Sequence, residues 1–471
     1  MNARAVFAAI CLFLTGFCPA ETITIIGTND IHAALEMMPR LKSFVQETKT
    51  ADPGALLLCA GDTRTGHPAC DAGKHPGRPV IDLMNRVGFD ACGLGLHDAD
   101  GGLTALRDNM RAAHFPFICA NAQPDTKNVL PLHPYRIFTR KGVRIGVLGL
   151  TCVGSGGFPA GRSASLPGLV FRNALQVAAD YRRLRSECDV LVLLTHLGFD
   201  NDRKLAALLP EADVIVGGGS YAPVNRVASE GGVLITQTAG RASHATLISL
   251  QVEDGKVVSG KAETISMDRY PPDADLGARV AEYTATPAMQ RVVGFNELPM
   301  VHREAVGCLE TDAIRYTTGA DVVVQNYGNI RIGMLPAGPI TVADVHRIDV
   351  YGNELIELRL RPAELVQMLT ALTKADGHGS PCVAGITYTG VLDSAFNLTV
   401  TDIRAENGKP LDPDKTYRVV TNDYAASVTP GLPLSSARRL GLRASDAIFR
   451  YLEKVKSINY TDSGRAVIRR E

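Results

Sequence analysis

Short apolar runs alternate with polar, helix-like stretches along the first half of the chain. Apolar runs of this kind, bounded by turn residues, are typical of buried strands, and the stretches between them fit covering helices. The alternation therefore predicts an α/β domain built around a largely buried sheet. The runs, which lie between residues 22 and 252, are TITIIG, ALLLCAG, FPFICAN, VRIGVLGL, DVLVLLTH, ADVIVGG, GGVLITQT and ATLISLQV.

A second set of strand-like runs predicts a separate C-terminal domain: VVVQNYGNIR, ELIELRL, ITYTG, LTVTDI and YRVVTND. Residues 271–290 open with a Pro-Pro pair and continue as a helix of mixed charge, which is typical of a connector. The predicted organisation is a signal peptide at 1–20, a first domain at 21–265, a linker helix region at 266–295 and a second domain at 296–471.

The first twenty residues have the pattern of a secretory signal. Arg4 precedes an apolar run at 5–17, and Cys18-Pro19-Ala20 places small residues before the expected cleavage point. The run is shorter than the roughly 20 apolar residues that span a bilayer. We therefore predict cleavage after Ala20, a periplasmic or secreted protein, and no integral membrane segment after cleavage.

Composition narrows the classes of partner. Lys+Arg and Asp+Glu both number 49 in the 471 residues, and 45% of the residues are hydrophobic. The balanced charge disfavours a nucleic acid polymer as partner, and the apolar content disfavours a disordered chain. Two of the 10 cysteines lie in the signal, and no C-x-x-C pair exists, so a zinc knuckle is not expected. Disulfides are allowed in an oxidising compartment, although the sequence fixes no pairing.

Carboxylates and imidazoles follow the predicted strands. Asp30 and His32 come after the first strand, and their spacing of two directs both side chains to the same side. Asp62 follows the second strand, and His196 ends the most hydrophobic one. Each residue alone also fits a helix cap. Together, their oxygen and nitrogen atoms are suitable ligands for a divalent metal ion.

These residues belong to a longer series of motifs: TNDIH at 28–32, GD at 61–62, GLHDAD at 95–100, HLG at 196–198, NYGNIR at 326–331, YGN at 351–353 and TNDY at 421–424. The series resembles the metallophosphoesterase superfamily, and specifically the secreted 5′-nucleotidase family, over essentially the whole mature chain. The resemblance implies an N-terminal metallophosphoesterase-type β-sandwich flanked by helices, plus a separate C-terminal α/β substrate-binding domain.

The resemblance also implies a metal centre. In the family, two divalent ions joined by a shared Asp activate water for in-line attack on a phosphate. Carried over to this sequence, Asp30 and His32 would bind the first ion, Asp62 would bridge, and His196 would bind the second ion.

Further roles follow from the same resemblance. His97, oriented by Asp100, would donate to the phosphate oxygen as charge develops. In the second domain, Arg331 and Arg303 would bind the phosphate. Asn326 would contact a polar edge of the substrate, and Tyr424 would stack on the base.

Several positions depart from the family's motifs. Leu96 stands where the family has a metal-binding Asn, and Gly219 and Tyr221 stand where it has two ligand histidines. A phenol with a pKa near 10 is a poor replacement ligand. We therefore expect one divalent ion rather than two, with Mn, Zn, Co and Mg not distinguished. The residues that would bind the nucleoside are also fewer than in the family. No second stacking aromatic is found around residues 380–385, and Pro430 replaces the family's ribose-binding Asp.

Three other histidines lie near the expected ligand positions. His67 and His75 are in the loop after Asp62, and His244 follows the strand after Tyr221. Under the hypothesis that one of them restores a ligand, its imidazole must reach the ion. A loop histidine is otherwise simply solvated.

These features leave more than one function open. The first is an exported 5′-nucleotidase-like hydrolase of a small-molecule phosphoester, in particular a nucleotide, with weakened or altered activity. The alternative is a catalytically inactive relative that binds a nucleotide or another ligand in the cell envelope. The retained donor residues favour the first function, and the three missing ligands favour the second. A non-nucleotide ester is a third substrate class, because fold alone does not fix a substrate.

Overall fold

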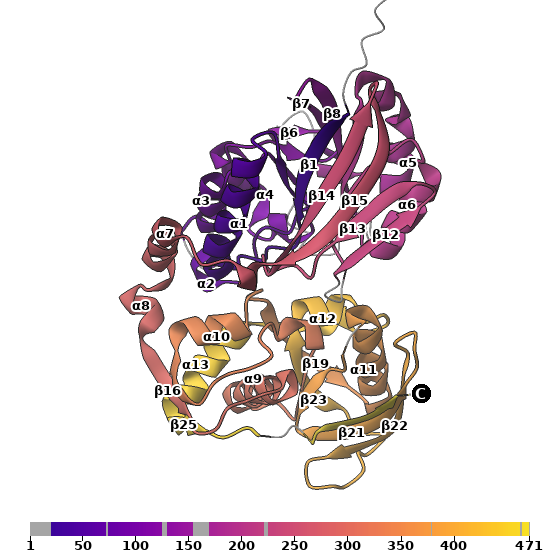
Figure 1. Ribbon diagram of the computed structural model, residues 1–471. Coiled ribbons are helices and arrows are strands. Elements are labelled where there is room, and N and C mark those ends of the chain that lie inside the picture. Colours follow the sequence, from indigo (N-terminus) through magenta and orange to yellow (C-terminus); the bar gives the residue numbers. More distant parts are fainter. Residues whose placement is uncertain are drawn as a thin grey trace, which may run out of the picture.

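A computed structural model describes residues 20–71, 74–124, 130–153, 169–220, 225–377, 379–461 and 464–470 of the chain. Residues 1–19 of the predicted signal lie outside this part. The chain forms a mixed α/β structure with two domains, one above the other in Figure 1. None of the helices in the described residues is long and apolar enough to span a membrane.

The first domain is a sandwich of two sheets. The first sheet has the strand order β15-β14-β1-β2-β3-β4-β6 and the second the order β12-β13-β11-β10-β8-β7. The strands of the first sheet are β1 (Glu21–Thr28), β2 (Leu56–Cys59), β3 (Ala91–Gly93), β4 (Phe117–Ile118), β6 (Leu132–His133), β14 (His244–Glu253) and β15 (Lys256–Ser266). Those of the second are β7 (Tyr135–Arg140), β8 (Val143–Thr151), β10 (Val190–His196), β11 (Val214–Gly217), β12 (Arg226–Glu230) and β13 (Val233–Gln237). A small ribbon pairs β5 (Ala122–Pro124) with β9 (Leu169–Phe171).

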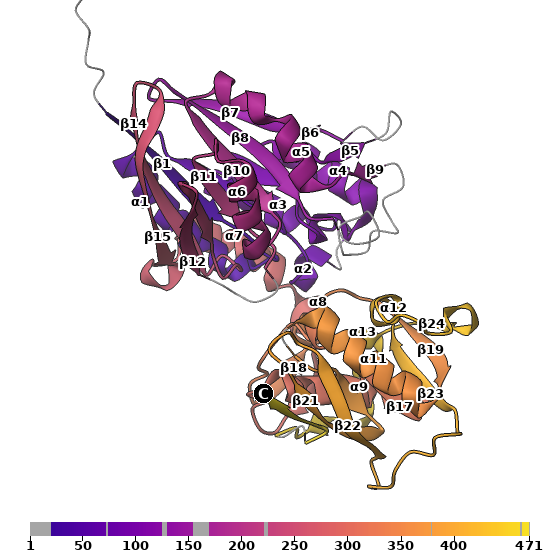
Figure 2. The same cartoon turned by 90° about the vertical axis from the view of Figure 1, so that its right-hand side faces the viewer.

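Buried apolar side chains fill the space between the two sheets. Ile25 and Leu58 of the first sheet and Val192 and Val216 of the second belong to one core cluster and are almost fully buried. Burial of one such side chain stabilises the fold by about 1.5–3 kcal/mol. Helices cover the outer faces (Figure 2). They are α1 (Met38–Ala51), α2 (Pro68–Asp71), α3 (Arg78–Val87) and α4 (Gly102–Ala112) beside the first sheet, and α5 (Ala174–Asp180) and α6 (Phe199–Leu208) beside the second.

The connector differs from the single helix that the sequence pattern predicts. It forms two helices, α7 (Ala274–Thr284) and α8 (Pro287–Gln290). Pro287 cannot continue α7 because it lacks a backbone N–H, whereas it fits the first turn of α8, which Thr286 caps. The helix α7 packs beside α1 and α3, where Arg279 pairs with Asp82 at 2.7 Å. The exact domain boundaries, at 265/266 and 295/296, stay a prediction.

The second domain is built on a central sheet with the order β20-β17-β23-β19-β24, beside two smaller sheets, β18-β16-β25 and β22-β21-β26. Its strands are β16 (Val292–Asn296), β17 (Val322–Gln325), β18 (Gly338–Thr341), β19 (Glu354–Leu360), β20 (Cys382–Ala384), β21 (Ile386–Leu392), β22 (Leu398–Ala405), β23 (Tyr417–Asn422), β24 (Arg438–Arg443), β25 (Ser457–Ile458) and β26 (Ala466–Arg470). Its helices are α9 (Arg303–Thr318), α10 (Val342–Ile348), α11 (Pro362–Asp376), α12 (Asp423–Ser427) and α13 (Ala444–Val455).

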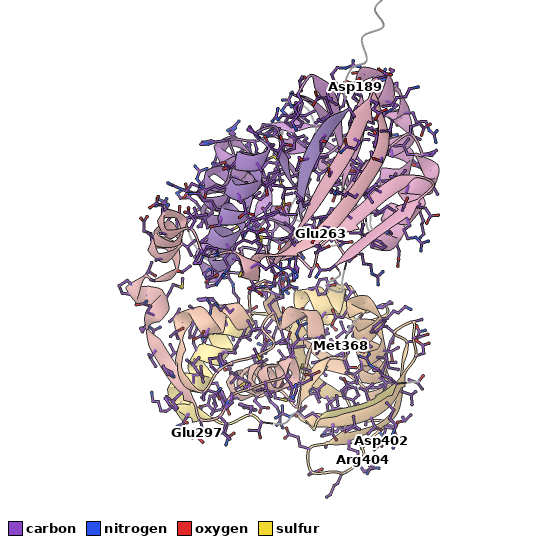
Figure 3. All side chains as sticks on the ribbon, viewed as in Figure 1. Asp189, Glu263, Glu297, Met368, Asp402 and Arg404 are labelled. Atoms are coloured by element: carbon purple, nitrogen blue, oxygen red, sulfur yellow. The ribbon has the colours of Figure 1, made fainter. Side chains whose placement is uncertain are left out.

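The two domains touch through polar contacts. The Glu36 carboxylate of the first domain accepts a hydrogen bond from Arg347 of α10 at 3.1 Å, and α10 also lies against α2. Charged pairs also lie far from this contact, for example Asp189 with Arg144 at the remote end of the sandwich (Figure 3). The eight cysteines in the described residues are all free thiols.

Candidate metal and phosphate site

The architecture of the sandwich brings the predicted ligands together. Strands β1, β2 and β3 run parallel in one sheet, and β8, β10, β11 and β13 run parallel in the other. Carboxyl ends of parallel strands lie along one edge of their sheet, where ligands of α/β proteins collect. Asp30 and His32 follow β1, Asp62 follows β2, and His196 is the last residue of β10.

The imidazoles of His32 and His196 both lie near the carboxylates of Asp30 and Asp62. The Nε2 atom of His196 lies 3.2 Å from Asp62 Oδ2 and 3.9 Å from Asp30 Oδ1. The Nε2 atom of His32 lies 3.8 Å from the same oxygen of each carboxylate. Within the described residues, Asp30, Asp62 and His196 form a group whose ligand atoms lie within 4.8 Å of one another. Two carboxylates and one imidazole make a mixed oxygen and nitrogen donor set suited to a divalent transition metal, and His32 lies beside this group.

Backbone carbonyls hold both imidazoles in position. Nδ1 of His196 lies 2.7 Å from the Ala60 carbonyl, and Nδ1 of His32 lies 3.0 Å from the Thr65 carbonyl. A proton on each Nδ1 leaves each Nε2 lone pair free to bind a cation. The Nε2 atom of His196 is buried without a hydrogen-bond partner. A buried nitrogen of this kind, aimed between two carboxylates, fits a metal ligand.

The carboxylates are held by donors from several loops. Asp30 Oδ2 accepts from the Gly219 N–H at 3.0 Å, and Asp62 Oδ1 accepts from the His97 N–H at 2.6 Å. Burial raises the pKa of Asp30. Burial acts in the same direction on Asp62, but the His196 and His97 imidazoles outweigh it and hold the pKa of Asp62 far below its usual range. Asp62 is therefore the firmly ionised carboxylate of the pair.

His97 forms a dyad with Asp100 at the rim of the same site. Its Nδ1 lies 2.8 Å from Asp100 Oδ2. Burial disfavours the charged imidazole, but the Asp100 carboxylate, the Tyr351 side chain and Asp62 outweigh this effect and raise the pKa of His97 to about 10. A protonated His97 can donate from Nε2 to an anion in the cavity.

The positions that depart from the family motifs also lie here. Leu96 lines the cavity, and its side chain offers no ligand atom. At Gly219, a Cβ atom would come 2.8 Å from His196 Cδ2, and its φ of +80° is unfavourable for other residues. A histidine at this position would therefore require a different backbone path. Tyr221 lies outside the described residues.

None of the three histidines considered as replacement ligands joins the group of metal-binding atoms found among the described residues. Both nitrogens of His67 are engaged, one with Glu36 at 3.2 Å and the other by the Ala69 N–H at 3.1 Å. His75 is exposed, and Nδ1 of His244 contacts the Ser243 hydroxyl at 3.0 Å. The hypothesis that one of them restores a ligand is not supported by this geometry.

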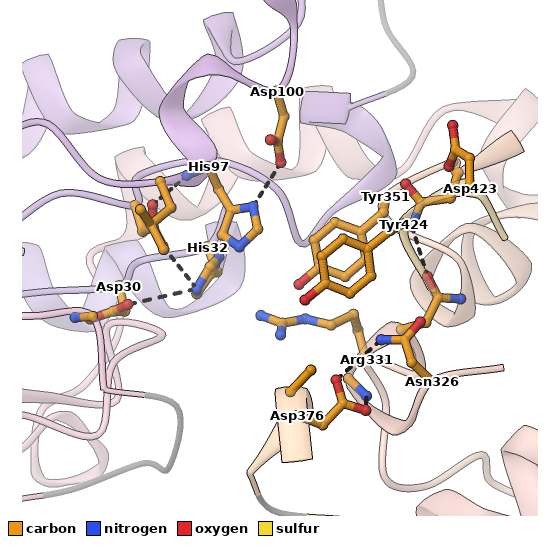
Figure 4. A pocket seen from close by; sticks show the side chains of 18 of the residues that line it. Asp30, His32, His97, Asp100, Asn326, Arg331, Tyr351, Asp376, Asp423 and Tyr424 are labelled. Atoms are coloured by element: carbon orange, nitrogen blue, oxygen red, sulfur yellow. Dashed lines mark hydrogen bonds and ion pairs between the residues drawn. The ribbon is translucent and has the colours of Figure 1, made fainter. Parts of the chain in front are cut away.

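The opposite wall of the site comes from the second domain. Asn326 follows β17, and its amide donates to Asp376 at 3.3 Å and accepts from Asn422 at 3.0 Å. Asp376 also accepts from the Gly328 N–H, so it fixes the loop that leads to Arg331. Figure 4 shows the Arg331 guanidinium extending from this loop toward Asp30 and His32.

All ten residues selected from the sequence line one cavity of about 1040 Å³ between the two domains: Asp30, His32, Asp62, His97, Asp100, His196, Arg303, Asn326, Arg331 and Tyr424. The structure therefore brings them together, whereas their individual roles stay predictions. A volume of this size is at the upper end of small-molecule sites in proteins.

The sequence analysis missed a second aromatic residue in the cavity. Tyr351 lies in the turn after α10, and its ring centroid is 5.3 Å from that of His97. Figure 4 shows Tyr351 and Tyr424 on the same side of the cavity, with both hydroxyls directed toward the metal-site residues. Tyr351 stands at the aromatic position of the YGN motif at 351–353 and not near residues 380–385, where the family resemblance places a second stacking aromatic.

Comparisons with known proteins agree with this arrangement. Residues 285–434 match the family model of the 5′-nucleotidase C-terminal domain. The protein UshA of Yersinia enterocolitica is 26% identical, and the alignment covers 92% of this chain and 91% of that protein. A 5′-nucleotidase of Vibrio cholerae is 25% identical, with 87% of this chain and 86% of that protein covered.

A solved structure extends the similarity to the fold. The 5′-nucleotidase precursor from Thermus thermophilus superposes with a TM-score of 0.83 at 25% sequence identity. The superposition covers 95% of this chain and 99% of that one. Both domains and the cavity between them therefore lie within the region of similarity.

Proposed function

Because the chain belongs to the 5′-nucleotidase family, with a calcineurin-like N-terminal domain, we propose that it hydrolyses a nucleoside 5′-phosphate to a nucleoside and phosphate. One observation carries this proposal. The donor atoms of Asp30, Asp62 and His196 converge on one wall of a cavity, and a guanidinium reaches toward them from the other wall. A cationic group opposite a metal site is the arrangement that a phosphate ester requires.

The family depends on divalent metal, and the residues present fit one ion. Asp30, Asp62, His32 and His196 would hold it, and the buried Nε2 atom of His196, which lies 3.2 Å from Asp62 Oδ2, supports this assignment. A second ion would lack ligands, since Leu96 offers none. A divalent ion, when bound, polarises a phosphoryl oxygen and lowers the pKa of water.

The residues of the chain would bind and orient the ester. Arg331 and Arg303 would bind the phosphate oxygens through charge-assisted hydrogen bonds. His97, protonated and oriented by Asp100, would donate to a phosphate oxygen as negative charge develops there. Tyr424 and Tyr351 would contact the base, and Asn326, fixed by Asp376, would contact a polar edge of the substrate.

Export is a part of the proposal that rests on the sequence. Arg4, the apolar run at 5–17 and the small residues ending at Ala20 support a cleaved signal and a periplasmic or secreted location. Sequencing of the mature N-terminus after expression with the full signal tests it. A protein that starts at Glu21 agrees with the proposal, and an uncleaved cytoplasmic product contradicts it.

The inactive relative is the second candidate function. Leu96 and Gly219 favour it, because each replaces a ligand of the family's metal site and neither offers a donor atom. Loss of supporting residues around a metal already weakens metal binding or activity about 10–100-fold. In this case the cavity would bind a nucleotide without hydrolysing it.

Metal content and turnover, measured together, distinguish the two candidates. We expect the purified protein to hold about one divalent ion per chain by elemental analysis. It should also hydrolyse AMP and p-nitrophenyl phosphate with Mn²⁺, Zn²⁺ or Co²⁺. Asp62→Asn retains an oxygen for the His97 N–H but removes the charge, so both metal and turnover should fall. Asp275→Asn, an exposed change on α7, is the matched control. Turnover that survives Asp62→Asn contradicts the metal site, and nucleotide binding without metal or turnover supports the inactive relative.

A further inference from the structure

Glu310 is a buried carboxyl group to which the proposed mechanism gives no part. It lies on α9 among the buried residues 305–311, and none of its side chain is exposed. It is not one of the residues that line the cavity. Burial of a carboxyl group costs folding free energy unless its oxygens are hydrogen-bonded, so its partners indicate what it does.

A chain of side-chain hydrogen bonds leads from Glu310 to the cavity wall. The Asn329 amide donates to Glu310 Oε1 at 2.9 Å, and Asn329 Oδ1 accepts from the Asn353 amide at 3.3 Å. Both asparagines are buried, and both line the cavity. Asn329 belongs to the loop at 326–331, and Asn353 belongs to the turn at 351–353. Glu310 therefore lies behind the cavity wall, where these two segments meet.

The two segments are also joined through their backbones. Ile330 and Asp349 form an antiparallel bridge, and the Arg331 N–H donates to the Ile348 carbonyl at 3.5 Å. The guanidinium of Arg331 lies 5.4 Å from the centroid of the Tyr351 ring, and both side chains extend into the cavity (Figure 4). The placement of Arg331 and Tyr351 thus depends on how firmly the loop and the turn are held together.

The surroundings of Glu310 favour a neutral carboxylic acid. Burial and the charge of Asp349 raise the pKa of Glu310 well above its usual range, and the hydrogen bond from Asn329 offsets only a part of this effect. Burial also raises the pKa of Asp349. Glu310 Oε2 has no hydrogen-bond partner among the described residues. A glutamine side chain is neutral, has a similar shape and can accept the same hydrogen bond from Asn329.

We propose that Glu310 is a positioning residue, which through Asn329 and Asn353 fixes the 326–331 loop to the 351–353 turn and so holds this wall of the cavity in its binding arrangement. The inference rests on the proposed function, because the substrate expected at this wall is the nucleotide. Without Glu310, the buried Asn329 amide would lose its acceptor. The two segments would then hold the binding arrangement for only a fraction of the time, and substrate affinity would fall by that fraction.

Amide hydrogen exchange of the ligand-free, purified mature protein tests this role without turnover. Glu310→Leu has a similar volume but no acceptor, so exchange in peptides that cover residues 326–331 and 349–353 should become about 5- to 10-fold faster. Exchange in β10 of the other domain should not change. Glu310→Gln should behave as the wild type does. Unchanged exchange of both segments in Glu310→Leu overturns the proposal.

Thr311→Val is the matched control on the same helix. Thr311 is fully buried, and its hydroxyl donates to the Gly307 carbonyl at 2.8 Å and lies 3.3 Å from the Val383 carbonyl, outside both segments. This variant should leave exchange in the loop and the turn unchanged. Faster exchange there in Thr311→Val, equal to that in Glu310→Leu, would mean that any loss in α9 loosens the wall, which contradicts a specific role of Glu310.

Steady-state kinetics with a saturating divalent metal give the functional result. Glu310→Leu should raise KM for AMP about 5- to 20-fold and change kcat less than about 3-fold, because bound substrate itself orders the two segments. Asn329→Ala should have a similar effect, and the double variant should be no worse than either single variant, since all three lose the same hydrogen bond. Effects that multiply in the double variant, or a Glu310→Gln as impaired as Glu310→Leu, overturn the proposal.

The two measurements separate this inference from the proposed function. Absence of AMP hydrolysis by the wild-type protein contradicts the proposed function, but hydrogen exchange still reports whether Glu310 fixes the two segments. AMP hydrolysis with the same exchange and the same KM in Glu310→Leu contradicts the positioning role alone. Should Glu310→Leu fail to fold, Asn329→Ala removes the same hydrogen bond from the loop side, and unchanged exchange in that variant overturns the proposal equally.

Discussion

The imidazole Nδ1 of His97 lies 2.8 Å from Oδ2 of Asp100, and the Thr65 hydroxyl donates to the same oxygen at 2.9 Å. Asp100 therefore fixes the ring of His97 while the ring faces the cavity. A carboxylate in this relation keeps the proton on Nδ1 and stabilises the imidazolium. Asp100 can thus affect hydrolysis without touching the substrate.

Asp100→Asn should lower kcat for AMP roughly 10- to 100-fold with little change in KM, because the amide no longer stabilises the charged His97. Steady-state kinetics with a saturating divalent metal measure both constants. Asp108→Asn, an exposed change on α4, serves as the control. An equal rise in KM with unchanged kcat would mean that Asp100 supports binding only.

Leu96→Asn should strengthen metal binding, because Leu96 lines the cavity at the turn that also carries His97. An amide oxygen there adds a ligand atom to the side of the site that lacks one. We expect roughly a 10-fold gain in affinity for Mn²⁺ or Zn²⁺, measured by competition with a metal indicator. Leu96→Gln also introduces an amide but on a longer side chain, so it separates the effect of a polar group from that of a correctly placed ligand oxygen. Equal affinity in Leu96→Asn and the wild type would show that position 96 does not reach the ion.

Gly219→Ala should destabilise the fold by about 1–3 kcal/mol, because the backbone there has a positive φ and the new Cβ would press on the His196 ring. Urea unfolding of the metal-free protein gives the free energy. Gly142→Ala is a matched control, since Gly142 also has a positive φ of +78° but has open space around its Cβ position. A larger loss of unfolding free energy in Gly219→Ala than in Gly142→Ala would report the contact with His196. Equal losses in the two variants would contradict that contact.

Asp202→Asn should remove a pH dependence of stability. Burial raises the pKa of Asp202 to about 7, and the Thr195 hydroxyl donates to one carboxylate oxygen while the other has no partner. The folded state therefore keeps a proton that the unfolded chain releases above its ordinary pKa of 3.8, so Asp202 lowers stability as pH rises from about 4 to about 7. Each unit of pKa shift corresponds to about 1.4 kcal/mol.

Unfolding of the wild type and Asp202→Asn in urea at pH 5, 6, 7 and 8 measures this effect. The variant should gain stability relative to the wild type up to about pH 7 and no further. Asp200→Asn, an exposed neighbour on α6, should show no such trend. A constant difference between wild type and Asp202→Asn at all four pH values would contradict a protonated Asp202.

Tyr424→Leu should raise KM for AMP about 5- to 100-fold, since stacking on an aromatic ring contributes about 1–3 kcal/mol per base. The KM for p-nitrophenyl phosphate, which has no base, should change much less. Tyr316→Leu, an exposed tyrosine on α9, is the control. A parallel rise for both substrates would assign Tyr424 to general packing of the cavity wall.

Most buried strands could be predicted from the sequence, whereas the edge strands could not. The runs around Leu58, Val147 and Val192 are apolar throughout because both faces of these strands are covered. In contrast, β12 and β15 are each exposed at more than half of their positions, and their sequences are mostly polar with little periodicity. Such strands are defined by pairing with their neighbours, which sequence alone does not reveal.

The candidate site was predictable only where motifs mark it. Asp30, Asp62 and His196 follow strands and stand in recognisable spacings, so their meeting in space could be expected. Arg241 lies in the turn between β13 and β14, outside these motifs, and lines the same cavity as Arg331 of the second domain. No local signal in the sequence predicts that residues so far apart in the chain line one cavity.

The backbone at the metal-site residues limits what alanine scanning can report. Asp30, His32 and Asp62 have φ values of +48°, +45° and +52°, a region in which Asp, Asn and His are tolerated better than most residues. Alanine at these positions would combine the loss of a functional group with a misfit of the main chain. Asparagine replacements keep the loop shape, so mutagenesis of this cleft is best interpreted from amide variants.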